Sequence, residues 1–126
     1  MSNGVILDGI RNQLTATTGA GVVSIPALFH EVEPNSDLGV AYIPGMVNLL
    51  RVNGNRVAMA KPFGPRDDQG QDLLEARVGE DLGQIGVGVQ VDFVDDWWAY
   101  HALYGEVHCA TNARRTPPGT VKWWSW

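Results

Sequence analysis

The first third of the chain alternates one helical segment with extended and turn-forming segments. Apolar residues recur at near-helical spacing behind Asn3, a residue type that caps helix N-termini; they are Val5, Ile6, Ile10 and Leu14. This pattern predicts a short amphipathic helix that stops within residues 15–21. Residues 22–25 predict a short strand ended by Pro26, because proline cannot donate to a ladder. Turn residues at 34–37 predict a loop that runs to Pro44.

The middle and second half carry stronger local patterns. Two β-rich runs, residues 46–52 and 57–60, flank Asn53-Gly54, which predicts a hairpin. Residues 71–83 predict a helix, because Leu74, Val78 and Leu82 recur every fourth residue. Valines at 87, 89 and 91 and Phe93 alternate with polar residues or glycine, which predicts a strand with one buried face. The order of elements predicts an α/β fold that ends in a loop-rich tail from Gly105 onward.

Length, charge and cysteine content exclude or disfavour several classes of protein. A length of 126 residues fits a single domain over 1–126, and a net charge of −5 disfavours nucleic acid and anionic lipid as partners. The apolar runs are far shorter than the roughly 20 residues of a spanning helix, and no signal peptide is recognisable. With a single cysteine, Cys109, the chain has no internal disulfide and no cysteine-rich zinc site. These features favour a cytoplasmic location.

Several residues are candidates for chemistry. Cys109 follows His108 in a polar stretch without helix or strand period, so it is either a reactive thiol or a buried cysteine beside a surface histidine. The adjacent carboxylates Asp95-Asp96 and Asp67-Asp68 are either pairs that hold a cation or a guanidinium, or solvated caps and turns. His30 precedes Glu33 by three residues, but no second ligand cluster accompanies this pair as a metal site.

The tryptophans allow two interpretations. Trp97-Trp98 and the C-terminal Trp123, Trp124 and Trp126 either fill the core or line a pocket. Core packing is the expected role, because each ring carries a large apolar area.

Five ordered motifs together resemble the C-terminal end of protein-arginine deiminases. They are MVNLL at 46–50, KPFGP at 61–65, FVDDWWAYH at 93–101, GEVHCATN at 105–112, and RR at 114–115 followed by KWW at 122–124. The similarity is dense over residues 44–124, and IPALF at 25–29 looks like a looser continuation of it.

The resemblance implies a partial pentein-type α/β propeller, with one to two of the family's five ββαβ modules in this chain. It also implies a hydrolase acting on the C–N bonds of amidines, which converts peptidyl-arginine to peptidyl-citrulline and ammonia through a cysteine thiouronium intermediate. Cys109 matches the family nucleophile, and it is the catalytic residue that carries over. The implied partner is an arginine-containing protein or peptide. Calcium is the cofactor implied by the vertebrate members, with no ligand assignable in this chain.

The sequence also departs from the family pattern. The family's His-x-Asp pair and its other guanidinium-binding Asp lie upstream of the matched segment, and His30 does not replace them. Ala110 stands in place of the glycine usual after the nucleophile, and Leu103 stands where some vertebrate members have a substrate-facing arginine. The TPPGTV link at 116–121 is longer than the family's and richer in proline. We therefore expect the isolated chain to be catalytically incomplete.

Two other hypotheses remain open. A partial propeller would leave strand edges and apolar surface uncovered, which favours a module that binds an upstream domain or self-associates as a homo-oligomer. A compact, toxin-like effector would instead rebuild a site around Cys109 from Asp95, Asp96, His101 and His108. Convergence of those groups within hydrogen-bond reach of Cys109 separates the two.

Overall fold

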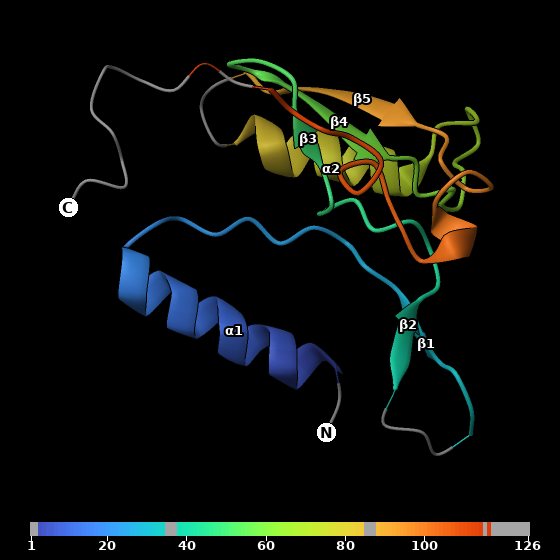
Figure 1. Cartoon of the computed structure of the whole chain (residues 1–126), viewed down its shortest axis with the longest axis horizontal. Helices are drawn as coiled ribbons and strands as arrows, with labels where there is room; N and C mark the ends of the chain where they lie inside the picture. The colour runs from blue at the N-terminus through green and yellow to red at the C-terminus, as the bar shows by residue number, and fades with distance from the viewer. Residues whose placement is uncertain (1–2, 35–37, 85–87, 115, 117–126) are drawn as a thin grey trace.

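The computed structural model describes residues 3–34, 38–84, 88–114 and 116, and these residues form a mixed α/β fold (Figure 1). The elements in chain order are α1 (Asn3–Thr18), β1 (Phe29–Glu31), β2 (Gly39–Ala41), β3 (Leu50–Arg51), β4 (Arg56–Ala60), α2 (Leu73–Gly83), β5 (Gln90–Val94) and a 3₁₀ helix, η1 (His101–Leu103). Helix α2 lies along the sheet β3-β4-β5, whereas α1 and the β1–β2 hairpin extend away from it (Figure 1). The predicted α/β class is confirmed. No described helix is long and apolar enough to cross a membrane.

The three-stranded sheet combines a local hairpin with a long-range pairing. Strands β3 and β4 are antiparallel with Leu50 opposite Ala58, and β5 joins β4 in parallel with Asp92 opposite Ala58. The predicted Asn-Gly hairpin is confirmed, with the Asn53 side chain accepting hydrogen bonds from the turn backbone. Its first strand is shorter than predicted, because residues 46–49 form a turn whose Met46 enters the core.

Helix α2 ends at the residue that the sequence predicts, and its predicted apolar face contacts the core. The Asp72 carboxylate caps it by accepting hydrogen bonds from the backbone N–H groups of Leu74 and Glu75, at 2.9 and 3.1 Å. Val78 and Leu82 are buried, and Leu74 packs against the same core. The core also includes Met46 and Met59, and it is joined by Val91 and Phe93 from the predicted alternating strand. The predicted face of α2 is therefore confirmed, and so is the buried face of β5.

The N-terminal third differs from the expectation in three respects. The predicted helix is present, but it already includes Asn3, and its apolar side chains Val5, Ile6, Leu7, Ile10 and Leu14 are all exposed. The strand predicted at 22–25 is wrong: that segment makes no ladder, although Val23 and Ile25 contact the core. The first strand is instead β1, which pairs with β2 inside the region predicted as loop. Residues 35–37 of the predicted turn lie outside the described residues.

Candidate active site around Cys109

Cys109 lies in an exposed turn, so the alternative of a buried cysteine is wrong. The turn follows η1, and it is closed by backbone hydrogen bonds from Ala110 N to Glu106 O and from Thr111 N to His108 O, both 3.1 Å. Val107, within the turn, is buried and anchors it to the rest of the fold. The thiol is therefore accessible on a segment whose backbone is held in place.

Asn48, which lies 61 positions before Cys109 in the sequence, contacts this turn. Its Oδ1 accepts hydrogen bonds from the backbone N–H groups of His108, at 2.8 Å, and Cys109, at 3.2 Å. Its Nδ2 donates to Cys109 Sγ at 3.2 Å. Sequence reasoning missed Asn48, since the MVNLL motif was interpreted only as an apolar strand; a polar residue inside that apolar run was the available signal.

A second contact joins the same two segments. The backbone N–H of Gly45 donates to Glu106 Oε1 at 2.9 Å, and Nδ1 of His101 lies 2.9 Å from the same oxygen. His101 and Glu106 are almost buried. The 45–48 turn therefore holds the 106–109 segment at both of its ends.

Asp96 lies buried next to this pair. It is 2% exposed, and among the described residues neither of its carboxylate oxygens nor Oε2 of Glu106 has a hydrogen-bond partner. Burial, and then the negative charge of Glu106, raise the pKa of Asp96 to about 6. The neighbouring Asp95 is exposed and accepts a hydrogen bond from Trp97 N at 3.3 Å. The two carboxylates have different environments and do not form a cation-binding pair.

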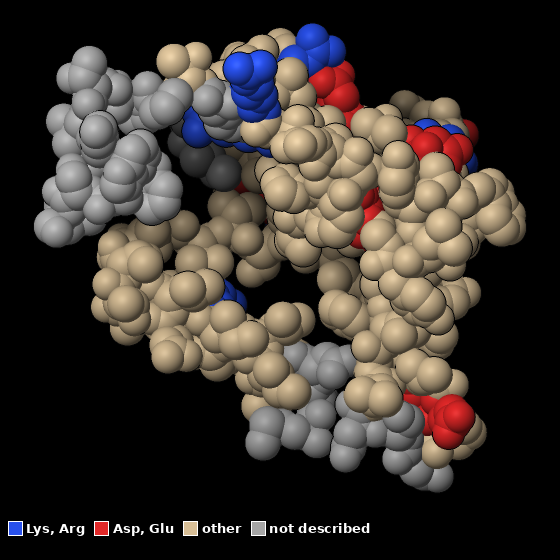
Figure 2. All heavy atoms as spheres, viewed as in Figure 1, with Lys and Arg blue, Asp and Glu red and all other residues tan. Residues whose placement is uncertain are grey.

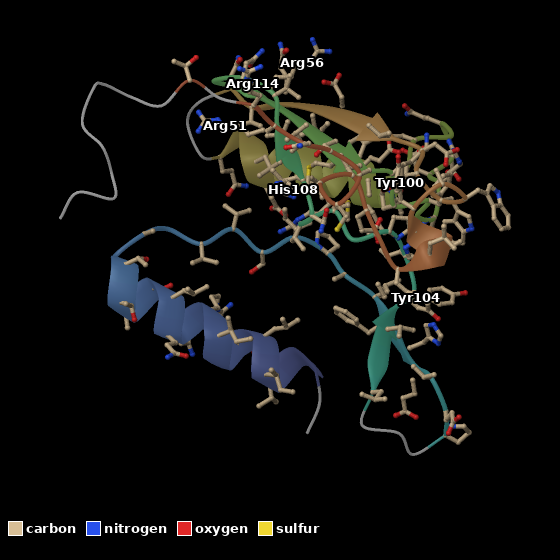
Figure 3. All side chains as sticks on the ribbon, viewed as in Figure 1. Arg51, Arg56, Tyr100, Tyr104, His108 and Arg114 are labelled. Atoms are coloured by element: carbon tan, nitrogen blue, oxygen red, sulfur yellow. The ribbon has the colours of Figure 1, made fainter. Side chains whose placement is uncertain are left out.

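A cleft of about 610 Å³ opens between the β1–β2 hairpin and the segment around η1. It is lined by His30, Val32, Val40, Ala41, Tyr42, Trp97, His101, Ala102, Tyr104 and Glu106, and Cys109 is not among them. In Figure 3, Tyr104 lies near the end of the β1–β2 hairpin, whereas His108, next to Cys109, lies farther from the hairpin. The cleft and the thiol therefore occupy separate places.

The expected core role of the paired tryptophans is wrong for Trp97-Trp98. Trp97 is half-buried and forms a wall of this cleft and of a second one near Phe63, and Trp98 is 83% exposed. Both tryptophans follow the end of β5, where the chain leaves the sheet. The buried cluster of the core consists of Met46, Met59, Val78 and Leu82. Trp123, Trp124 and Trp126 lie outside the described residues.

The other candidates take structural positions. Asp67 Oδ1 accepts hydrogen bonds from the backbone of Gln69 and Gln71, which makes it a turn residue. His30 is exposed and packs edge-on against Tyr42 at 5.7 Å. In the part of the chain that the structure describes, no three His, Cys, Asp or Glu side chains converge to hold a metal ion. The described residues therefore assign no cluster of carboxylate ligands to a calcium ion.

The rebuilt site of the effector hypothesis is not assembled. Asp96 and His101 lie together with Glu106, but the hydrogen bonds described for His101 go to Glu106 and those of the Cys109 thiol to Asn48. The chemistry available at the surface is therefore that of one accessible thiol beside an amide donor.

Comparison of the sequence with known proteins identifies a family. The profile of the family described as Protein-arginine deiminase (PAD) matches residues 7–125. The chain belongs to the protein-arginine deiminase family. Protein-arginine deiminase type-3 of Rattus norvegicus is 39% identical over 121 residues, which cover 94% of this chain and 17% of the relative. Type-4 of Homo sapiens is 40% identical over 104 residues, which cover 82% of this chain and 15% of the relative.

The chain spans about a sixth of the length of the protein-arginine deiminases it matches. The matched region contains both sides of the contact described above, the 45–48 turn and the Cys109 turn. It also contains the buried Asp96 and its partly buried neighbours His101 and Glu106. The family match therefore covers all the residues that build this site.

Proposed function

We propose that this chain supplies the cysteine nucleophile of a protein-arginine deiminase, which converts peptidyl-arginine to peptidyl-citrulline and ammonia. The observation that carries the proposal is Cys109, an exposed thiol on a turn held by Asn48 within a chain of this family. Exposure matters because a nucleophilic sulfur must reach a substrate carbon, which a buried cysteine cannot do.

The proposed reaction has two steps. The Cys109 thiolate attacks the guanidinium carbon of the substrate arginine, a C–S bond forms, and a C–N bond breaks as ammonia leaves with a proton from a general acid. Water then attacks the thiouronium carbon, the C–S bond breaks, and the products are a citrulline side chain and the regenerated thiol. The arginine side chain is always cationic, so carboxylates that bind it are required for orientation.

The described residues supply only part of this machinery. Asp96 and Glu106 are buried, and their described contacts lie away from the thiol. A thiolate without a general acid and a guanidinium-binding pair lacks the two effects that are each typically worth about 100-fold or more. By the resemblance, these groups belong to the upstream His-x-Asp and Asp, and the proposed enzyme is complete only with them.

The same proposal covers the fold. Strands β3 and β4, helix α2 and strand β5 follow one another in the order ββαβ, with β5 parallel to β4. This order supports one pentein module, with the chain 1–126 as part of a single propeller domain.

The test compares two lengths of chain. The longest natural open reading frame that contains residues 1–126, and the 126-residue chain alone, are incubated with arginine peptides, with calcium or with a chelator, and citrulline and ammonia are measured. We expect product from the long chain, its loss in Cys109→Ser, and none from the short chain above background. Product that persists in the Cys109→Ser long chain would remove Cys109 as the nucleophile.

A second candidate, a module that associates through its apolar surface, is favoured by α1. Five large apolar side chains of this helix are exposed, and Figure 2 shows few charged residues over this face. Sedimentation of the short chain tests it: we expect Ile10→Glu to shift any dimer toward monomer, and the exposed polar control Asn12→Glu to leave it unchanged.

A further inference from the structure

The Asn48 side chain uses its amide on two different groups of the Cys109 turn. The oxygen accepts from two backbone N–H groups, and the nitrogen donates to the sulfur. The reversed orientation of the amide would place its NH₂ against two N–H donors. The hydrogen-bond pattern therefore fixes which end of the amide faces Cys109 Sγ.

The backbone beneath Asn48 is held in place. Its N–H donates to Gly45 O at 3.0 Å, and its own carbonyl accepts from His108 N at 3.1 Å. Met46, inside the same turn, is 1% exposed and belongs to the core, and Leu50 begins β3 two residues after Asn48. The amide is thus presented to the turn from a fixed part of the fold, which reduces the conformational entropy lost when its hydrogen bonds form.

We propose that Asn48 is a positioning residue that holds the Cys109 turn through Oδ1 and stabilises negative charge on the sulfur through its Nδ2–H. Hydrogen bonds to a charged acceptor are stronger than those between neutral groups, so the bond to Sγ favours the thiolate over the thiol. This inference rests on the proposed role of Cys109 as nucleophile. It adds a residue that lies 61 positions away in the sequence.

Two substitutions separate the two hydrogen-bonding roles. Asn48→Asp has nearly the same shape and keeps an oxygen for the two backbone N–H groups, but it removes the donor to sulfur and adds a negative charge beside it. Asn48→Ala removes both roles. Asn112→Asp is the matched control, because it adds the same charge at an exposed asparagine three residues after Cys109.

The measurement is the rate of Cys109 alkylation by iodoacetamide in the 126-residue chain, from pH 6.5 to 10, with thermal unfolding followed in parallel. At pH 7.5 we expect Asn48→Asp to react at no more than about one tenth of the wild-type rate, with little change in thermal midpoint. This difference from the wild type should shrink or reverse as the pH rises to 10. Asn112→Asp should stay within about twofold of the wild type. Asn48→Ala should lose thermal stability as well as reactivity.

Two results would overturn the inference: an Asn48→Asp rate equal to that of the wild type at pH 7.5, or a rate lowered by the same factor at every pH. The second would show that Asn48 acts only on access to the sulfur. Because alkylation needs no turnover, a lack of citrulline in the longer chain would contradict the proposed function and leave this measurement unaffected.

Discussion

The buried Asp96 carboxyl group makes a contribution to the stability of the protein that decreases as the pH rises through the acid range. Burial and the nearby Glu106 raise the pKa of Asp96 from 3.8 to about 6. Between these values the folded state binds a proton that the unfolded state releases, so the free energy of unfolding decreases as the pH rises from about 4 to about 6. At about pH 6 the buried carboxylate is half charged, and this loss is nearly complete about one pH unit higher.

The perturbation that isolates this effect is Asp96→Asn, which has nearly the same shape and cannot ionise. One pKa unit corresponds to 1.36 kcal/mol, so the rise from 3.8 to about 6 corresponds to at most about 3 kcal/mol. Local relaxation around the charged carboxylate reduces this cost, so we expect about 1–3 kcal/mol. The free energy of unfolding of Asp96→Asn, relative to that of the wild type, should therefore increase by about 1–3 kcal/mol as the pH is raised from 4 to 7.5.

The assay is urea unfolding followed by far-ultraviolet circular dichroism at several pH values. The quantity compared is the difference in unfolding free energy between variant and wild type, because other titrating groups cancel in it. Asp95→Asn is the matched control, because it makes the same change at the neighbouring carboxylate, which is exposed. A difference for Asp96→Asn that does not change with pH, or a variant less stable than the wild type at pH 7.5, would refute the reasoning.

Two further predictions concern packing around α2. Leu82→Ala should lower the free energy of unfolding by about 2–5 kcal/mol because Leu82 is buried in the core, whereas Leu73→Ala, at an exposed position, should change it by less than about 0.5 kcal/mol; chemical denaturation measures both. Gly64→Ala should destabilise the protein, because a Cβ there would lie 2.7 Å from Asp72 Oδ1. Gly79→Ala should stabilise it by up to about 1 kcal/mol, because this residue is in helix α2 and its Cβ would meet no atom of another part of the chain within 4 Å. A loss of thermal midpoint in both variants, or in neither, would contradict this.

The local patterns of the sequence were sufficient for three elements. Helix α2, the Asn53-Gly54 hairpin and the buried face of β5 each depend on spacing or turn chemistry within about a dozen residues, and all three are present. The same reasoning found Cys109 in an exposed polar turn. It placed a strand at 22–25 in error, because an extended segment becomes a strand only where a backbone partner lies beside it.

The tertiary structure alone decided which distant residues meet. Asp95 and Asp96 are adjacent residues of the same type on the segment between β5 and η1, yet Asp95 is exposed whereas Asp96 is buried beside Glu106. The contact of Asn48 with Cys109 and that of Gly45 with Glu106 each join residues 61 positions apart. Hydrophobic periodicity reports only which face of a segment is buried, whereas such contacts require the core to bring separate segments together. The sequence by itself therefore identified the thiol, and the packing of the fold determined its neighbours.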